Sequence, residues 1–419
     1  MLPKVNARPV KQINNELDPR FLSLNALNDN TAHDSNSREM MFSSHLSQFL
    51  LVNGATKKRC QTGAEAEFSK ATFKYQFPCD AVIVQIIQKY APSVGVSQIH
   101  ENPMVLIVYE NEHTKEIGII EAATYSTYID KKHMHYGFKY TFKPLCEQLH
   151  PGMRVQAGSI IGDSPAVLDE NGAMDYCYGL EANVAFMGIP QVVEDGLVVS
   201  ESFLKRITTT GIEKRIAFWG KTYYPLNLYG DEQHYKPFPD IGERIGDNGL
   251  LFALRRYDEL LSPVEMTPKA LRKRDTLFDK PIYAVPNAKV IDVSVHRGGR
   301  RDKPYTPVGM SEQIEKYYNA QVQYYTRILE QYQALYQQRR RSLKLSPELH
   351  RLVVEAINYV GFENNPATAY IRRKNTQATN HVEQVYAGEE VDDWRVEITF
   401  EYPVVPCEGF KNSDQHGGS

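Results

Sequence analysis

Apolar residues recur along the chain in short runs, and over most of its length these runs favour β-strands. Residues 81–87 and 104–109 are almost continuously apolar, and a third apolar run at 117–120 follows the polar stretch 111–115. Two apolar runs joined by a short polar link predict a β-hairpin. We therefore expect a strand at 81–87 and a hairpin over 104–120.

Short β-type runs also alternate with glycine-containing turns between residues 152 and 201. Frequent turns between short strands are typical of a small barrel or sandwich rather than of helices. Residues 284–295 have the same character, and 290–295 form the clearest strand. The polar residues before residue 38 predict an extended arm, and residues 39–52 predict a short helix.

The pattern changes between residues 311 and 361, where apolar side chains recur at spacings of three and four. That is the period of a helix, with Gln321 in the one polar slot of the stripe. Ser346 and Pro347 are the residue types of a helix N-cap and first turn, and a second apolar stripe follows them. We expect a helical hairpin inserted in a β-rich domain. The first stripe consists of Ile314, Tyr318, Tyr325, Ile328, Tyr332 and Leu335.

Composition narrows the class of protein. A chain of 419 residues exceeds what one hydrophobic core usually organises, so about two or three structural units are expected. The net charge of −3 gives no whole-chain attraction to nucleic acid. Five widely spaced cysteines support neither a disulfide framework nor a structural zinc site. Without a signal peptide or an apolar run of membrane-spanning length, we expect a soluble intracellular protein.

Candidate chemistry begins with two adjacent acids, Glu194 and Asp195, which stand between apolar runs. Paired carboxylates can hold a hard cation such as Mg²⁺, which takes few protein ligands and keeps several waters. An acidic turn is the simpler interpretation of an isolated Glu-Asp pair. The sequence around this pair changes that balance.

Three ordered blocks around the acids resemble the β subunit of multi-subunit DNA-directed RNA polymerases. Residues 152–165 (GMRVQAGSIIGDSP) are similar to the family's G-x-x-V-x-x-G-x-x-L-A-D-G-P stretch. Residues 179–187 (GLEANVAFM) resemble its G-x-N-x-x-V-A-F-M segment, with Glu181 in place of the Asn. Residues 194–201 (EDGLVVSE) resemble its E-D-A-I-x-x-S-E. The resemblance implies that the Glu194–Asp195 pair reaches toward the second magnesium and the incoming nucleotide.

A second constellation lies near the N-terminus. Residues 33–48 (HDSNSREMMFSSHLSQ) resemble the family's H-D-D-A-N-R-A-L-M-G-S-N-M-Q-R-Q run. The resemblance implies that Arg38 contacts the nucleotide triphosphate, as suits a guanidinium fork, and that Gln48 also binds substrate. Ser44 stands where the family has Asn. The structural alternative is that Arg38 is a helix-start arginine paired with Asp34.

A third constellation closes the chain. Residues 409–419 (GFKNSDQHGGS) resemble the family's G-D-K-x-x-x-R-H-G-N-K-G motif, which lies near the RNA 3′ end and the substrate phosphates. Lys411 matches the first lysine, and His416 matches the histidine. Gln415 stands at the motif's Arg and Ser419 at its second Lys. A frayed tail is the structural alternative.

Other blocks carry the same resemblance without chemistry. Residues 62–65 (TGAE) resemble the family's T-G-M-E, and residues 267–271 (TPKAL) resemble the T-P-E-E-K-L-L of its flap region. Residues 285–293 (VPNAKVIDV) are similar to a shortened V-P-x-G-x-x-G-x-V-I-D-V. The resemblance therefore implies that the helical hairpin lies within or beside a flap.

The resemblance implies a mixed, β-rich α+β fold, in which a double-psi β-barrel region is interrupted by a flap domain with a helical hairpin at 311–361. We expect four segments along the chain. They are an arm and substrate-side segment (1–70), a barrel and hybrid-binding region (71–205), a flap region (206–390), and a return to the barrel that carries the active-site lysine (391–419).

The implied function is that of a DNA-directed RNA polymerase subunit, a nucleotidyltransferase that is inactive alone. The chain would supply the β half of a two-barrel active site, with Arg38 and Lys411 on phosphates and Glu194 and Asp195 on the second Mg²⁺. Its partners would be a β′-type subunit whose aspartates hold the first Mg²⁺, other β fragments, the DNA template, the RNA transcript and nucleoside triphosphates, with no membrane.

Split β subunits are a feature of giant bacteriophages, so we expect a phage-encoded portion of β that acts in the host cytoplasm or the virion. Two alternatives stay open. One is a non-catalytic β-like scaffold that docks transcription factors, which Ser44, Gln415 and Ser419 favour. The other is a two-barrel RNA-dependent polymerase, which the flap-like block disfavours.

Overall fold

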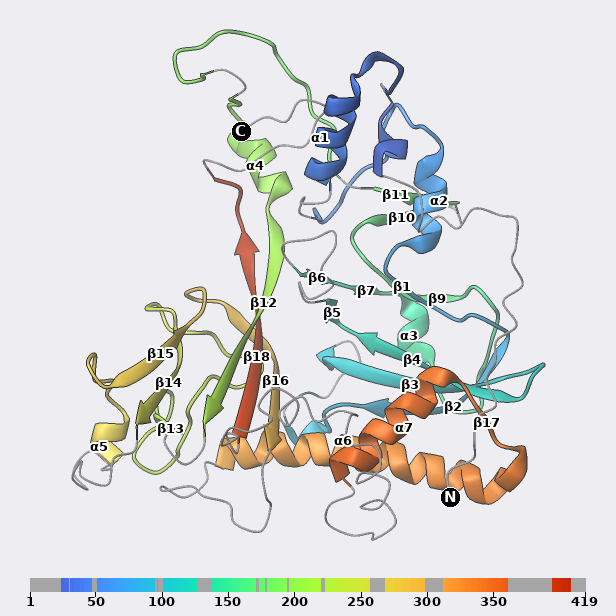
Figure 1. Cartoon of the computed structure of the whole chain (residues 1–419), viewed down its shortest axis with the longest axis vertical. Helices are drawn as coiled ribbons and strands as arrows, with labels where there is room; N and C mark the ends of the chain where they lie inside the picture. The colour runs from blue at the N-terminus through green and yellow to red at the C-terminus, as the bar shows by residue number, and fades with distance from the viewer. Residues whose placement is uncertain are drawn as a thin grey trace.

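The computed structural model describes residues 24–29, 31–46, 51–94, 96, 101–126, 137–170, 173–177, 179–193, 196–219, 223–256, 268–297, 312–360 and 394–407. These residues form a mixed fold of helices and several β-sheets, and none of the described sheets closes into a barrel (Figure 1). The mixed, β-rich class predicted from the sequence is therefore confirmed.

The largest sheet has five strands in the order β17-β4-β3-β2-β8. β3 and β4 form the predicted hairpin, and Lys115 in their connecting turn has a positive φ of 60°. Only β17 runs parallel to its neighbour, β4. The strands are β2 (Ala81–Gln88), β3 (Met104–Asn111), β4 (Glu116–Ala123), β8 (Arg154–Val155) and β17 (Lys344–Leu345).

A second sheet joins β12 (Thr209–Trp219), β18 (Trp394–Val404) and β16 (Lys289–Arg297) in that order. β18 pairs with β12 over its whole length, although the two strands are far apart in the sequence. The chain's two tryptophans, Trp219 and Trp394, face each other at one end of this pairing, with nearly parallel rings 6.2 Å apart.

A β-bulge in β16 decides which side chains enter the core of the second sheet. The register shifts between Val290 and Asp292, so that one extra residue, Ile291, lies on the β16 side. Side chains of a strand alternate between faces, and an extra residue reverses that alternation. As a result Val290, Val293 and Val295 all lie in one apolar core, whereas Asp292 is buried elsewhere.

The remaining strands form small sheets. Those between residues 152 and 201 make no barrel or sandwich of their own, because β8 joins the five-stranded sheet, β9 pairs with β1 and β7, and only β10 and β11 pair with each other. β8 and β9 thus pair outside this stretch, because such short strands find partners distant in the sequence. A double-psi barrel that includes them stays a prediction. The strands are β1 (Lys74–Gln76), β5 (Tyr125–Ser126), β6 (Phe138–Lys139), β7 (Thr141–Phe142), β9 (Ile160–Asp163), β10 (Val167–Glu170), β11 (Ala173–Tyr176), β13 (Tyr223–Pro225), β14 (Leu250–Arg256) and β15 (Asp279–Tyr283).

The predicted helical hairpin is confirmed as α6 (Glu312–Arg339) and α7 (Pro347–Val360). The hydroxyl of Ser346 accepts a hydrogen bond from the Leu349 amide at 3.2 Å, which is the expected N-cap of α7. The two helices are tied by the Tyr325 hydroxyl, which donates to Glu355 Oε1 at 2.6 Å.

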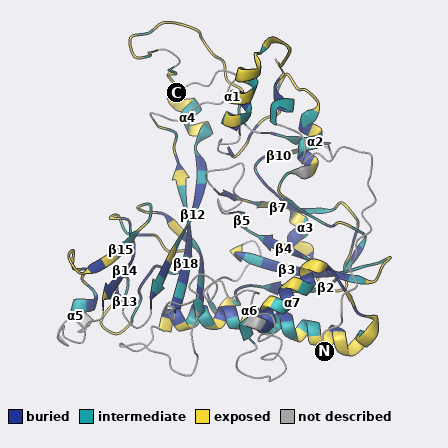
Figure 2. Cartoon of the chain, viewed as in Figure 1, coloured by how far each residue is buried: buried dark blue, intermediate teal, exposed yellow. Residues whose placement is uncertain are grey.

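α6 spans two separate apolar cores rather than one. Ile314, Tyr317 and Ala320 on its N-terminal half pack into the core of the β12–β18–β16 sheet. Ile328 and Leu335, further along, pack with α7 against the five-stranded sheet. Figure 1 shows the helix running beneath both sheets, and Figure 2 shows it buried on the side that faces them.

The remaining helices are short. None of the described helices is long and apolar enough to cross a membrane. The α-helices are α1 (Asn36–Leu46), α2 (Ala64–Ala71), α3 (Pro144–Gln148), α4 (Glu201–Ile207) and α5 (Pro268–Leu271), and the 3₁₀ turns are η2 (Leu24–Leu27), η3 (Thr31–His33), η4 (Pro92–Val94) and η7 (Arg340–Ser342).

The packing of α6 gives a stability prediction. Ile328→Ala removes a side chain that is 2% exposed from the core beneath the five-stranded sheet, so we expect a loss of about 2–5 kcal/mol in the free energy of unfolding. Ile216→Ala, the same change at a β12 position that is 41% exposed, should cost less than about 1 kcal/mol. Urea unfolding followed by circular dichroism measures both, and equal losses would contradict the described packing.

Candidate functional site

Arg38 lies in the first turn of α1, and its side chain is exposed. The helix start is formed by Ser35, whose backbone carbonyl accepts from the Arg38 amide at 2.9 Å. Asp34 accepts instead from the Asn28 side-chain amide at 2.8 Å, so the predicted alternative of an Arg38–Asp34 pair is wrong. Among the described residues, the Arg38 guanidinium bonds only to the sulfur of Met41, at 3.8 Å. No carboxylate of the described residues pairs with it.

The TGAE block of residues 62–65 forms the start of α2. Glu65 is buried, and its carboxylate turns back to accept from the amides of Thr62 and Gly63, at 3.3 and 2.9 Å. The Thr62 hydroxyl donates to the carbonyl of Ala26 at 2.6 Å, which ties the segment before α1 to α2. A side-chain carboxylate that satisfies the free amides at a helix start is a structural role.

Contacts also join the segment between α1 and α2 to the block at residues 179–187. Glu181, which stands where the family has Asn, accepts from the Arg59 amide at 2.6 Å and forms an ion pair with the Arg59 side chain at 3.2 Å. The amide of Thr56 donates to the carbonyl of Gly179 at 3.1 Å. The chain after α1 is therefore fastened to the start of this block, even though the two are far apart in the sequence.

Beyond Glu181 the chain has no regular secondary structure over residues 181–193 and 196–200, and its apolar side chains face solvent. Figures 1 and 2 show it arching away from the end of the molecule that holds α1 and α4. Phe186 is 98% exposed and Val193 is 78% exposed. The segment then enters α4, where the Ser200 hydroxyl accepts from the Phe203 amide. The other exposed apolar residues are Val184, Met187, Leu197, Val198 and Val199.

Most of the predicted site residues lie outside the described part of the chain. Glu194, Asp195, Gln48, Lys411 and His416 are all in this group. Their neighbours along the sequence can nevertheless be placed, and these converge on one residue.

That residue is Thr209, the first residue of β12. Its hydroxyl, which is buried, donates to the carbonyl of Leu51 at 2.7 Å, on the segment that follows α1. Thr209 also pairs with Val404 at the end of β18. Leu51, Thr209 and Val404 therefore lie together at the end of the β12–β18 pairing. Along the chain they stand 13, 14 and 7 residues from Arg38, Asp195 and Lys411.

Metal binding was predicted at Glu194 and Asp195. No group of three or more His, Cys, Asp or Glu side chains suited to a metal occurs among the residues that the structure describes. Glu194 and Asp195 lie outside the described residues, so Mg²⁺ binding by this pair stays a prediction.

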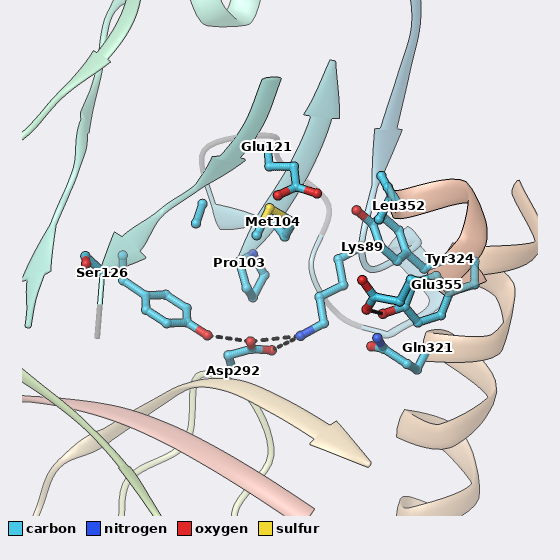
Figure 3. A pocket seen from close by; sticks show the side chains of 13 residues that line it. Lys89, Pro103, Met104, Glu121, Ser126, Asp292, Gln321, Tyr324, Leu352 and Glu355 are labelled. Atoms are coloured by element: carbon cyan, nitrogen blue, oxygen red, sulfur yellow. Dashed lines mark hydrogen bonds and ion pairs between the residues drawn. The ribbon is translucent and has the colours of Figure 1, made fainter. Parts of the chain in front are cut away.

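Sequence reasoning missed a buried carboxylate that accepts four hydrogen bonds, that of Asp292. The Lys89 ammonium lies 2.8 Å from both of its oxygens, and the hydroxyls of Tyr90 and Tyr125 donate to it at 2.8 and 2.6 Å. Lys89 also donates to the Ser294 hydroxyl at 2.7 Å. Figure 3 shows this carboxylate between Lys89 and a tyrosine hydroxyl.

Electrostatics keep the Asp292 network ionised. Burial alone would raise the pKa of the Asp292 carboxyl, but the Lys89 charge and the hydrogen bonds from Tyr125 and Tyr90 hold the pKa below its usual value. Burial and the facing carboxylate raise the pKa of both tyrosines, so their hydroxyls stay protonated and donate. The group is a buried structural ion pair with every ligand supplied by the chain.

A signal for this pair was present in the sequence. Asp292 is the one charged residue in the apolar run of residues 290–295, and Lys89 and Tyr90 directly follow the apolar strand β2. A charge inside a predicted strand indicates a buried partner, because an unpaired buried charge is strongly unfavourable. The identity of the partner could not be predicted, because it comes from a different sheet.

No protein-family model matches this sequence, and a search of curated proteins finds no significant relative.

The Asp292 network gives a second prediction. Asp292→Asn leaves the Lys89 ammonium buried without its anion, so we expect a loss of about 3–5 kcal/mol in the free energy of unfolding. Asp247→Asn, the same change at an exposed position, should have little effect. Tryptophan fluorescence during urea unfolding is a suitable measurement, because both tryptophans lie in the adjoining core.

The same variant should change the acid dependence of stability. The folded-state pKa of Asp292 lies below the usual 3.8, so its stabilisation is complete above the unfolded pKa and declines as the pH falls through the folded one. Asp292→Asn should lack this part of the decline below about pH 4. An identical pH profile in both proteins would show that the carboxylate is not paired as described.

Proposed function

We propose that the chain is a subunit of a DNA-directed RNA polymerase and contributes the β half of a two-barrel active site for template-directed nucleotidyl transfer. The observation that carries the proposal is the junction at Thr209, where the Leu51 carbonyl and the Val404 strand end meet. The motif order in the sequence requires three distant segments to reach one wall of a cleft. The described residues Leu51, Thr209 and Val404, which flank these segments, lie together.

In this proposal the exposed Arg38 guanidinium and the Lys411 ammonium neutralise the phosphates of the incoming nucleotide and the RNA end. Gln48 and His416 contact the substrate. Glu194 and Asp195 face the second Mg²⁺, which would supply charge stabilisation at the transferred phosphoryl group when bound. In this proposal the barrel lies within residues 71–205 and 391–419, and the flap lies within 206–390, which hold the β13–β14–β15 sheet and the α6–α7 hairpin.

The exposed apolar segment supports an assembly rather than a free-standing enzyme. Phe186, Val184 and Met187 are 98%, 63% and 68% exposed, which is unusual for three apolar residues so close in sequence. Contiguous exposed apolar side chains mark surfaces that another protein covers. We propose that a β′-type subunit covers residues 184–199, together with other β fragments, DNA and RNA in the complete enzyme.

A non-catalytic β-like scaffold that docks transcription factors is the second candidate. The observation that favours it is Ser44, whose hydroxyl donates to the Met40 carbonyl of its own helix at 2.9 Å. A side chain turned back on its helix makes no substrate contact of the kind that an Asn could make. Gln415 and Ser419 stand at two further positions where the motif has cations.

Reconstitution with β′-type partners tests the polymerase proposal. Lys411→Ala should lower the elongation rate at least about 100-fold, because it removes a cation from developing phosphate charge. Arg38→Ala, Glu194→Gln and Asp195→Asn should each lower it at least about tenfold. Lys205→Ala and Glu232→Gln, at exposed positions outside the motifs, are the matched controls. Normal elongation by all four variants would favour the scaffold.

The proposed interface gives a separate prediction. Phe186→Ser should leave the free energy of unfolding within about 0.5 kcal/mol of the unchanged protein, because the side chain makes little contact with the chain itself. It should weaken co-purification with the β′-type subunit at least about tenfold. Phe278→Ser, at a position that is 55% exposed near α5, is the control. Equal retention of the partner by both variants would rule out the segment as the interface.

A further inference from the structure

A cavity of about 550 Å³ lies where the α6–α7 hairpin meets the start of β3, the end of β4 and the middle of β16 (Figure 3). The Lys89–Asp292 ion pair lies on one side of it. Gln321 and Tyr324 line it from α6, and both are buried. Glu121 on β4 and Glu355 on α7 are exposed and lie where the cavity opens to solvent.

Gln321 is the feature that the fold does not explain. It is the one polar residue in the buried stripe of α6 that was predicted from the sequence, and it is only 6% exposed. Its Oε1 atom has no hydrogen-bond partner among the described residues. A buried polar atom without a partner costs about 1–3 kcal/mol, and a leucine would fit the stripe. The amide therefore points to a partner from outside the chain.

The charges around the cavity favour a cation. Its lining holds one cation, Lys89, and three carboxylates, those of Asp292, Glu121 and Glu355. Lys89 and Asp292 neutralise each other, so within the lining the other two acids leave an excess of negative charge, which the nearby Arg351 reduces but does not cancel. The Tyr325 hydroxyl occupies one oxygen of Glu355.

Nearby charges and burial shift the pKa values of the groups around Glu121 and Glu355. Burial raises the pKa of Glu121, the nearby charge of Arg351 lowers it, and the carboxylates of Glu355 and Glu348 raise it further, with a net upward shift. Burial also raises the pKa of Tyr324, and the same carboxylates Glu121 and Glu355 add to that rise. Both acids therefore act on the wall of the cavity from which Tyr324 and Gln321 project.

We propose that this cavity binds an organic cation, an alkylammonium or guanidinium group, between Glu121 and Glu355, with one of its N–H groups donating to Gln321 Oε1. Carboxylates and amide oxygens are acceptors that match such donors, and charge-assisted hydrogen bonds are the stronger kind. The rings of Tyr324 and Tyr325 add faces on which a cation can rest. A metal ion fits less well, because the described residues hold no group of three suitable ligands.

The same group can come from a free diamine or from an arginine or lysine of a partner chain. The cavity volume falls in the usual range for small-ligand sites, which is about 300–1,000 Å³. Neither source depends on the polymerase proposal, because no residue of the cavity belongs to the predicted catalytic set. The site is therefore a second function of the chain.

Calorimetric titration of the full chain with agmatine, which carries both a guanidinium and an ammonium group, tests the proposal at about 0.15 M salt, where weak surface attraction is screened. We expect saturable binding at one site. Glu121→Gln and Glu355→Gln should each weaken binding at least about tenfold, since each removes a charge-assisted contact. Glu315→Gln removes the same charge from an exposed position on α6 and should change nothing.

Gln321→Leu separates a binding role from a structural one. It should weaken agmatine binding while leaving the thermal unfolding midpoint unchanged or raised, because an unpartnered amide is removed. An acetylated Gly-Arg-Gly amide then identifies the source: binding as tight as agmatine indicates a partner's side chain, and no binding indicates a free small cation. Absence of agmatine binding, or binding that survives both Glu121→Gln and Glu355→Gln, overturns the proposal.

Discussion

The carboxylate of Asp292 joins two sheets that share no strand. It lies on β16 of the three-stranded sheet, whereas Lys89 and Tyr90 directly follow β2 of the five-stranded sheet. A buried carboxylate is tolerated only when its charge is neutralised and its oxygens are hydrogen-bonded. The donors of these bonds must therefore lie at particular positions around it. They fix how one sheet is oriented on the other, which apolar packing alone does not. The bulge at Ile291 is a consequence, because without it the side chain could not leave the valine face and reach Lys89.

α6 provides the second connection between the sheets, and its contribution is apolar. Ala320 packs into the core of the three-stranded sheet, and Tyr324, one turn later, packs into the core beneath the five-stranded sheet. Gln321 lies between them, so the polar position marks the place where the helix passes from one core to the other. The two cores do not merge there, and the space left between them is the cavity. The ion pair, the helix and the cavity thus follow from one constraint, the joining of two sheets that were built separately.

The sequence predicted best those features that depend on neighbours along the chain. The β3–β4 hairpin and the α6–α7 hairpin were found because their apolar spacing and turn residues are local. The pairing of the strands in residues 152–201 could not be predicted, because short strands take their partners from elsewhere, as β9 does with β1. The partners of Asp292 could not be found for the same reason. Of the candidate site, Arg38 lies in the first turn of a helix, as its structural alternative predicted. The pairing with Asp34 in that alternative is not found among the described residues, where Asp34 accepts from Asn28.

The region around Asp292 and the region around the Thr209 junction differ in how far the described residues pair their charges and bury their apolar side chains. Around Asp292 the chain itself supplies the charge and the hydrogen bonds that the buried carboxylate needs. Around the Thr209 junction the reverse holds, because Arg38 has no carboxylate partner among the described residues and Phe186 has almost no cover. The same chain buries the larger side chains of Tyr90 and Trp394 completely, whereas Phe186 is 98% exposed. The exposed apolar side chains at that end are the observation on which the proposed interface with a partner subunit rests.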